Sequence, residues 1–516
     1  MNRRQFVAGS AAGLSALAAG TALSAEKDTA TDYAFEPEHV RRLAQELAKK
    51  PYTPPDRSLP PPLAEMKYDA YRAIRFLPDH ALWRQEKLPF QLQFFHRGWL
   101  YKEKTEIFIV SDGRARRLAY SPEMFSFGLT PPVHDPELGF AGFRIHSRIN
   151  RPDYFDEVGV FQGASYFRAV AKEQVYGLSA RGIALRTGDP HGEEFPIFTT
   201  FWIERPAPAA ASLVVHALLN GPSVTGAFHF VITPGNETVY DTSAVVYPRT
   251  DLAEAGFGTG TSMFFFGAND RRGVDDFRPE VHDSDGLAIH SGNGEELWRP
   301  LKNPKNLQFS IFDEQDLRGF GLLQRVRRFT AYEDLESHYE KRPSLWVEPI
   351  GQWGPGSVQL VELPANEEIH DNIVAFWRPR DVLKAQREYR LTYRLHWTNG
   401  IAGRPELARF TNTRVAAARD GNRLFVLDVT AASVPLPDVK EVRADLTVDK
   451  GKLHRIVLQP NPESKGVRLS FEFEPEKDAS RAELRCVLRH GDKALTETWV
   501  YQWAPSMGAD RLPSRG

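Results

Sequence analysis

Hydrophobic and polar residues alternate with a period of two over most of the chain. Clear examples are residues 90–94 (Phe-Gln-Leu-Gln-Phe), 197–202 and 389–395, and short turns rich in Gly, Pro and Asn separate such runs. This alternation predicts antiparallel β-strands. Helical spacing is confined to residues 38–49 and 63–71, and strands do not alternate with helices, which disfavours a doubly wound sheet. The pattern therefore predicts an all-β protein.

The predicted strands fall into two groups that meet near residues 398–400 (Thr-Asn-Gly). The second group has the length and the short strands of an immunoglobulin-like sandwich. The first group is too long for a simple sandwich and indicates a larger sheet assembly. We therefore expect one domain over residues 26–399 and a second over residues 400–516.

The first 25 residues have a different character. Arg3 and Arg4 precede an uncharged, Gly- and Ala-rich apolar stretch that ends in Ala-Leu-Ser-Ala at residues 22–25. A charged start, an apolar middle and a small-residue exit indicate an export signal, and the paired arginines indicate the twin-arginine route. The stretch is shorter than the ~20 residues of a membrane span. We expect a periplasmic protein that is not an integral membrane protein.

Composition narrows the range of partners. The 516 residues include 65 Lys and Arg against 67 Asp and Glu, a net charge of −2, which argues against nucleic acid as a partner. Cys486 is the single cysteine, so an intrachain disulfide and a multi-cysteine zinc site are excluded. The glycine-rich residues 256–260 and the His-Asp-Ser-Asp-Gly string at 282–286 are poor matches to phosphate and calcium loops. We expect no metal and no cofactor.

The segment from about residue 277 to 380 combines carboxylates with aromatic side chains. Asp283 and Asp371 lie in polar, turn-like surroundings. A carboxyl pair is what glycosidic cleavage needs, with one acid protonated and the other ionised. The side chains that we expect to bind a sugar around this pair are Trp298, Tyr339, Arg342, Trp346, Glu348, Trp353 and Trp377.

Structural interpretations of the same residues stay open. A Trp on a β-strand usually packs in the core. Asp371 before Asn372 fits an Asx turn, Asp283 fits a turn, and Arg342 could pair with Glu340. The residues alone do not decide between these interpretations and a carbohydrate site.

Four strings in this segment carry a family resemblance. They are residues 277–286 (Phe-Arg-Pro-Glu-Val-His-Asp-Ser-Asp-Gly), 342–349 (Arg-Pro-Ser-Leu-Trp-Val-Glu-Pro), 351–358 and 371–377. They resemble the periplasmic glucan biosynthesis proteins of the G/D family, and the twin-arginine signal points to the D branch. The resemblance implies a galactose-mutarotase-like β-sandwich with a glucan cleft, followed by an immunoglobulin-like domain.

The resemblance also implies an activity. Such proteins act in the synthesis of osmoregulated periplasmic glucans, and the family looks like inverting endo-β-1,2-glucanases. Carried onto this chain, Asp371 would be the general acid, Asp283 the base, directly or through water, and Tyr339 a cleft residue near the reacting sugar. A glucan-shaping protein that cleaves nothing is the main alternative, and a mutarotase-like isomerase is a weaker one. The expected partner is β-1,2-glucan. A homodimer and contact with glucan-synthesis machinery at the inner membrane are left open.

Overall fold

The computed structural model describes residues 32–271, 273–401, 406–431 and 436–505. The predicted export signal lies outside these residues. Strands account for 47% of the residues and helices for 9%, which confirms the all-β prediction. Helix α1 (Glu38–Ala48) lies where it was expected, and α2 (Pro61–Ala64) and α3 (Tyr68–Ala73) share the second predicted helical region. Among the described residues, none of the helices has the length and apolar character that crossing a membrane requires.

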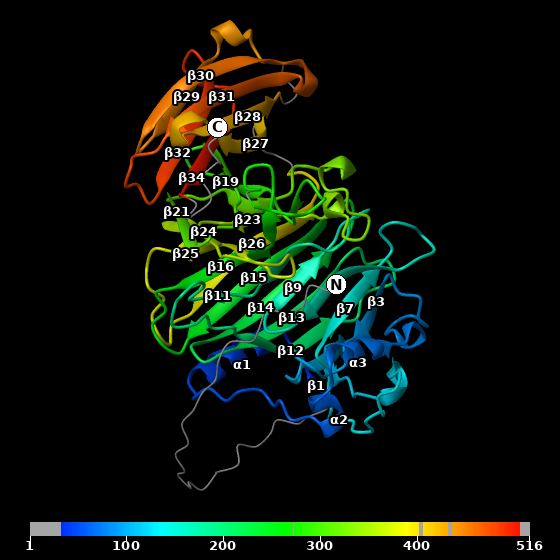
Figure 1. Ribbon diagram of the computed structural model, residues 1–516. Helices are drawn as coiled ribbons and strands as arrows, with labels where there is room; N and C mark the ends of the chain where they lie inside the picture. Colours follow the sequence, from blue (N-terminus) through cyan, green and yellow to red (C-terminus); the bar gives the residue numbers. More distant parts are fainter. Residues whose placement is uncertain (1–31, 272, 402–405, 432–435, 506–516) are drawn as a thin grey trace.

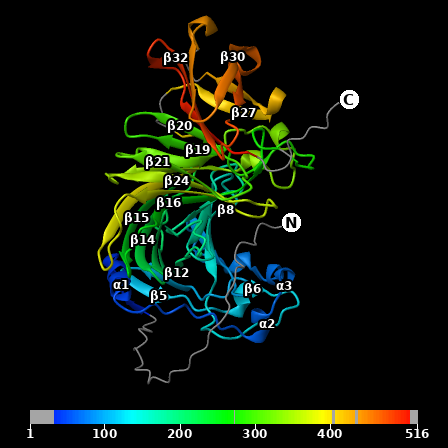
Figure 2. The same ribbon diagram turned by 60° about the vertical axis from the view of Figure 1, so that its left-hand side comes forward.

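Two large sheets form the body of the molecule (Figures 1 and 2). The larger sheet has 16 strands, in the order β1 (Asp32–Ala34), β5 (Arg114–Arg117), β4 (Glu106–Ser111), β12 (Ile197–Glu204), β13 (Leu213–Asn220), β14 (Val224–Thr233), β15 (Thr238–Pro248), β26 (Tyr389–Thr398), β23 (Ser344–Ile350), β22 (Gly319–Leu323), β19 (Gly286–His290), β20 (Glu296–Pro300), β34 (Thr498–Trp503), β32 (Ala482–His490) and β29 (Arg443–Val448), with β33 (Lys493–Ala494) beside β32.

The second large sheet has ten strands, in the order β21 (Gln308–Glu314), β24 (Gly356–Glu362), β25 (Ile373–Pro379), β16 (Ala255–Ser262), β10 (Ser179–Arg181), β9 (Tyr166–Ala169), β8 (Asp156–Gln162), β7 (Gly142–Ser147) and β3 (Phe90–Phe94), with β11 (Ala184–Leu185) beside β16. The remaining pairs are β17 (Phe264–Phe266) with β18 (Val281–His282) and β2 (Arg75–Phe76) with β6 (Phe125–Ser126).

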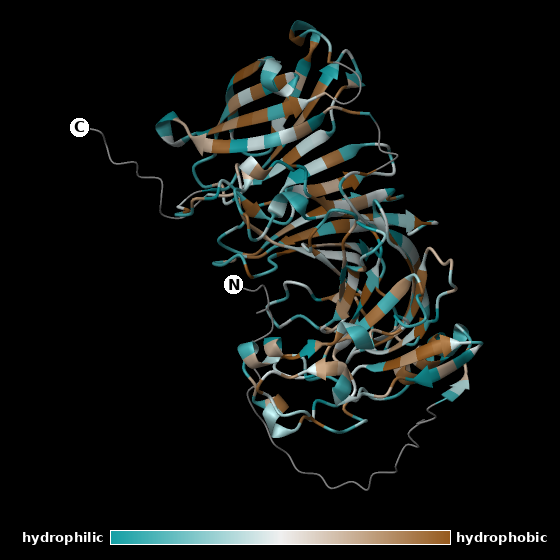
Figure 3. Ribbon diagram, turned by 90° about the vertical axis from the view of Figure 1, so that its right-hand side faces the viewer, coloured by the Kyte–Doolittle hydropathy of each residue, from teal (hydrophilic) through white to brown (hydrophobic). Residues whose placement is uncertain are grey.

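Apolar side chains fill the space between the two large sheets. Phe167 of the ten-stranded sheet stacks on Tyr240 of the larger sheet, with ring centroids 5.7 Å apart. Along many strands, apolar residues of the core face alternate with polar ones, which appears as colour banding in Figure 3. The body is therefore a β-sandwich, while its assignment to the galactose-mutarotase type stays a prediction.

The C-terminal strands form a smaller sandwich. A four-stranded sheet of β27 (Arg409–Ala417), β28 (Arg423–Thr430), β31 (Gly466–Glu474) and β30 (Lys452–Asn461) shares a core with β32 and β34. The two sandwiches are joined by more than a linker, because β34 pairs in parallel with β20 through Leu297↔Thr498 and Trp298↔Trp499. The larger sheet thus continues from residues before position 400 into residues after it. The immunoglobulin-like type of the smaller sandwich stays a prediction.

Candidate functional site

Asp283 and Asp371 are brought together by the short segment that follows β16. Asp283 donates its backbone N–H to the carbonyl oxygen of Met263 at 2.8 Å. The next residue, Phe264, donates its backbone N–H to the side-chain oxygen of Asn372 at 2.9 Å. The two predicted acids, far apart in the sequence, are thus attached at or next to two successive residues of one segment.

Asp283 is fully buried and forms an ion pair with Arg342. The guanidinium lies 4.1 Å from the ring centroid of Tyr339 and also donates from Nη2 to the carbonyl oxygen of Ser337 at 3.1 Å. Glu340, the alternative partner for Arg342, instead contacts the ring of His338. Asp283, Tyr339 and Arg342 therefore belong to one network of contacts, while their role in a glucan site stays a prediction.

Tyr339 extends this network toward Asp371. Its ring is buried, and its hydroxyl donates to Oε2 of Glu368 at 3.2 Å. Arg278 forms an ion pair with the same carboxylate at 2.8 Å. Because Glu368 lies three residues before Asp371, the loop that carries the predicted acid is held by both contacts. Glu368 and Arg278 were not predicted as site residues, although Arg278 lies in the string 277–286 that carries the family resemblance.

Asp371 lies two residues before β25 and is partly exposed. Its charge acts on Tyr166 and Arg181 of the neighbouring strands β9 and β10. Burial, together with the carboxylates of Glu193 and Asp371, raises the pKa of Tyr166 to about 12. Burial alone would lower the pKa of Arg181, but Tyr166 and the two carboxylates raise it above its usual value. Asp371 therefore lies within electrostatic range of a cation and a protonated phenol.

Three of the four tryptophans expected to bind sugar are core residues. Trp298, Trp346 and Trp377 are at most 5% exposed. Trp377 packs between the large sheets, whereas the other two pack beneath the smaller sandwich. Arg325 covers the Trp298 ring at 3.4 Å. With their faces covered, these rings fit the structural interpretation rather than sugar stacking.

In the described part of the chain, Trp353 and Glu348 bond to residues of β26 and not to Asp283. Trp353 is partly exposed, but its indole N–H donates to the carbonyl oxygen of Thr392 at 3.0 Å. Glu348 contacts Arg394 at 3.4 Å and His396 at 3.1 Å across strands β23 and β26. Both residues are thus held by partners on β26.

A cavity of about 780 Å³ lies at the other end of the ten-stranded sheet, between helix α3 and strands β3 and β7. Its walls include Tyr71, Phe95 and Tyr154, with Arg144 and His146 on β7. Arg144 Nε and His146 Nε2 are buried there without a hydrogen-bond partner among the described residues. Burial lowers the pKa of His146, which favours the neutral imidazole. Aromatic walls and buried polar atoms that lack hydrogen-bond partners suit a polyhydroxylated ligand.

This cavity and the Asp371 surroundings share one face of the sheet. Phe143 and Ile145 of β7 and Ala180 of β10 point into the core, so Arg144 and Arg181 point to the opposite, outer face. Three strand spacings separate β7 from β10, which is roughly 14 Å. One extended ligand could therefore reach both places.

Glu280, His282 and Asp285 are the described residues whose type and spacing could hold a cation, with ligand atoms within 4.8 Å of one another. His282 Nε2 lies 2.9 Å from Glu280 and 3.5 Å from Asp285. Burial alone would lower the pKa of His282, but these two carboxylates raise it above its usual value. The three side chains thus form an ion-pair cluster in which the two carboxylates favour the protonated imidazole.

Comparison with known proteins agrees with the family-level resemblance. The family described as "Periplasmic glucan biosynthesis protein, MdoG" matches residues 35–503. A "Glucans biosynthesis protein G" of Rhodopseudomonas palustris (strain BisA53) is 57% identical over 471 residues, which cover 91% of this chain and 93% of the relative. A protein of the same name from Vibrio cholerae serotype O1 (strain M66-2) is 48% identical, with 91% and 87% covered. These relatives bear the name G, so they do not support the D branch that the signal type suggested.

Proposed function

The chain belongs to the family of periplasmic glucan biosynthesis proteins (MdoG), and from this premise we propose that it is an inverting endo-β-1,2-glucanase that cuts the linear glucan backbone. Membership places the protein in periplasmic glucan biosynthesis. The proposed cleavage would control the length and structure of the glucan. The observation that supports it is the attachment of Asp283 to Met263 and of Asn372, which directly follows Asp371, to the adjacent residue Phe264.

The proposed reaction needs two proton transfers. Asp371, which is partly exposed, donates a proton to the glycosidic oxygen as the bond to the anomeric carbon breaks. A water molecule attacks that carbon from the opposite face and gives its proton to Asp283. Because Asp283 has no exposed surface, this proton travels through an ordered water. Attack from the opposite face converts the β-linkage into an α-configured reducing end.

Product analysis on linear β-1,2-glucan tests the proposal. We expect new reducing ends from the mature protein, initially in the α-configuration by NMR. Asp371→Asn should lower kcat by about 10² to 10⁴, the usual contribution of a general acid. Asp381→Asn is a matched control, since Asp381 is exposed just beyond the other end of β25. Unchanged kcat in Asp371→Asn would contradict the role of this residue.

A glucan-binding protein that cleaves nothing is the second candidate. It is favoured by one observation, the complete burial of Asp283 behind the guanidinium of Arg342. This candidate predicts saturable binding of linear β-1,2-glucan with no reducing ends after long incubation. It also predicts that Asp371→Asn binds and acts like the wild-type protein.

A further inference from the structure

Strand β21 ends the ten-stranded sheet and has an open edge. It pairs with β24 over its whole length, from Gln308↔Glu362 to Glu314↔Gly356, without a bulge. On its other side, no backbone hydrogen bond joins residues 308–314 to another part of the described chain. Alternate N–H and C=O groups along this edge are therefore free to pair with an added strand.

The side chains of β21 do not protect this edge. Its sequence, Gln-Phe-Ser-Ile-Phe-Asp-Glu, contains none of the Lys or Pro residues that usually prevent edge pairing. Phe309 and Ile311 are 38% and 59% exposed on one face of the strand, next to the exposed Leu307. A seven-residue edge with an exposed apolar stripe is a surface that normally has a partner.

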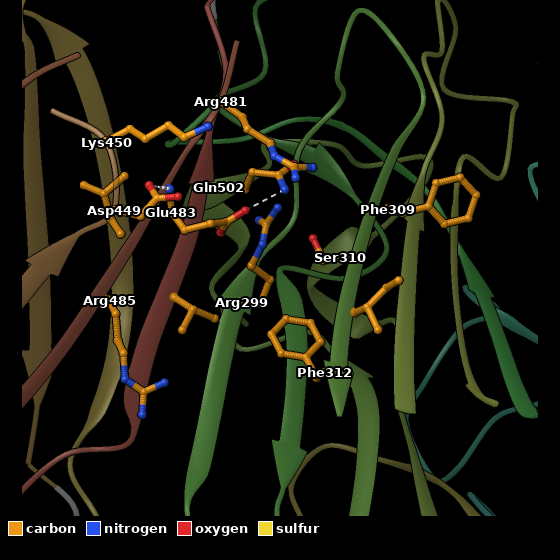
Figure 4. A pocket seen from close by; sticks show the side chains of 13 residues that line it. Arg299, Phe309, Ser310, Phe312, Asp449, Lys450, Arg481, Glu483, Arg485 and Gln502 are labelled. Atoms are coloured by element: carbon orange, nitrogen blue, oxygen red, sulfur yellow. Dashed lines mark hydrogen bonds between the residues drawn. The ribbon is translucent and has the colours of Figure 1, made fainter. Parts of the chain in front are cut away.

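A groove of about 520 Å³ runs along this edge (Figure 4). Its lining includes the four consecutive residues 309–312, whose side chains alternate between the two faces of the strand. Only a groove that follows the edge itself meets both faces. Figure 4 shows Ser310 and Phe312 on the side of Arg299, and Phe309 on the far side of the strand. Ser310 Oγ is buried without a hydrogen-bond partner in the described structure.

The wall opposite β21 is basic. It contains Arg299, Lys450, Arg481 and Arg485 against two acids, Asp449 and Glu483. Arg299 and Arg485 are already paired with Glu362 and Glu295. Lys450 and Arg481 are exposed and form no ion pair with the described residues. The two cations without an ion-pair partner therefore face the space that an added strand would occupy.

We propose that β21 is a docking strand for an extended, acidic segment of a partner protein in which apolar and acidic residues alternate. Alternate side chains of an added strand point to opposite faces. The apolar ones would continue the stripe of Phe309 and Ile311, and the carboxylates would meet Lys450 and Arg481. This surface is separate from Asp283 and Asp371, so the proposal does not rest on the glucanase activity.

The test uses a fluorescein-labelled octapeptide of alternating valine and glutamate with the full mature protein. We expect saturable binding by fluorescence anisotropy, weakened at least tenfold by the pair Lys450→Glu and Arg481→Glu. The control pair Lys477→Glu and Lys493→Glu makes the same charge change at exposed positions away from the groove and should leave binding unchanged. A lysine-for-glutamate version of the peptide should not bind.

Hydrogen exchange separates strand addition from general charge attraction. We expect the backbone amides among residues 308–314 that point away from β24 to exchange at least tenfold more slowly when the peptide is bound. A peptide of the same charge with alternate N-methylated residues cannot pair and should give no protection. The proposal is overturned if the glutamate peptide does not bind, or if it binds without protecting these amides. It is also overturned if raising the protein concentration alone protects them, since a second copy would then be the occupant.

Discussion

Asn372 and Phe264 are paired through both amide groups. The side-chain oxygen of Asn372 accepts the backbone N–H of Phe264 at 2.9 Å, and its side-chain N–H donates to the carbonyl oxygen of Phe264 at 3.0 Å. A side chain thus takes the place of a neighbouring strand. Because Asn372 follows Asp371 directly, the contact fixes the position of the proposed acid relative to the segment that holds Asp283.

Asn372→Ala should therefore lower activity beyond its effect on stability. The substitution removes a buried amide that also donates to Leu363, so we expect a loss of about 2–3 kcal/mol in the free energy of unfolding. We also expect kcat on linear β-1,2-glucan to fall at least tenfold, because Asp371 is no longer held. Asn303→Ala is the matched control, since Asn303 makes the same kind of contacts with Phe265 and Ala365. A kcat loss as large in the control would contradict the positioning role.

The Arg342–Asp283 pair is expected to be strongly coupled. Both side chains are buried, and removal of one partner leaves a buried charge without compensation. Arg342→Met alone should destabilise the protein by about 3–5 kcal/mol. Arg342→Met with Asp283→Asn should lose clearly less than the sum of the two single changes. The measurement is a double-mutant cycle by urea unfolding, and additive losses would show that the pair does not interact.

The sequence was sufficient to predict where β-strands occur. It was insufficient to predict which strands lie side by side in a sheet. The alternation at 90–94 coincides with β3, and 389–395 lies within β26. The parallel pairing of β34 with β20 joins residues about 200 positions apart, and no local pattern specifies such a contact. Trp377 illustrates the limit at the site, because it shares the core face of β25 with Ile373 and Ala375. Period-two reading of that strand would have assigned it to the core, whereas residue type alone suggested a sugar-binding ring.

The cavity beside β7 should bind the glucan away from the point of cleavage. We expect Arg144→Ala and His146→Ala to raise KM for long linear β-1,2-glucan about tenfold with kcat unchanged. The lost contacts would have stabilised the bound substrate and the transition state equally. An oligosaccharide too short to span from Asp371 to the cavity should be cleaved equally by both variants and the wild-type protein. Arg116→Ala, which changes an exposed arginine on β5 outside the cavity, is the control. An equal change in KM for short and long substrates would contradict a distal binding role.

Lys302 should make stability depend on pH in the alkaline range. Its side chain is 7% exposed, and burial lowers the pKa of its amine from 10.5 to about 8. Below pH 8 the folded protein must bury a charged amine, which is unfavourable. Between pH 8 and 10.5 the unfolded chain binds more protons than the folded one, so the contribution of Lys302 to stability rises with pH. The full change is roughly 3 kcal/mol, at 1.36 kcal/mol for each pKa unit.

Lys302→Met isolates this contribution. The difference in the free energy of unfolding between wild type and variant should shift in favour of the wild type by about 3 kcal/mol between pH 7 and pH 10.5, measured by urea unfolding. Lys477→Met, which changes an exposed amine, should give a difference that is constant over the same range. A constant difference for Lys302→Met as well would mean that the buried amine keeps its proton, held by the nearby carboxylate of Glu362 and the carbonyl oxygen of Gln502.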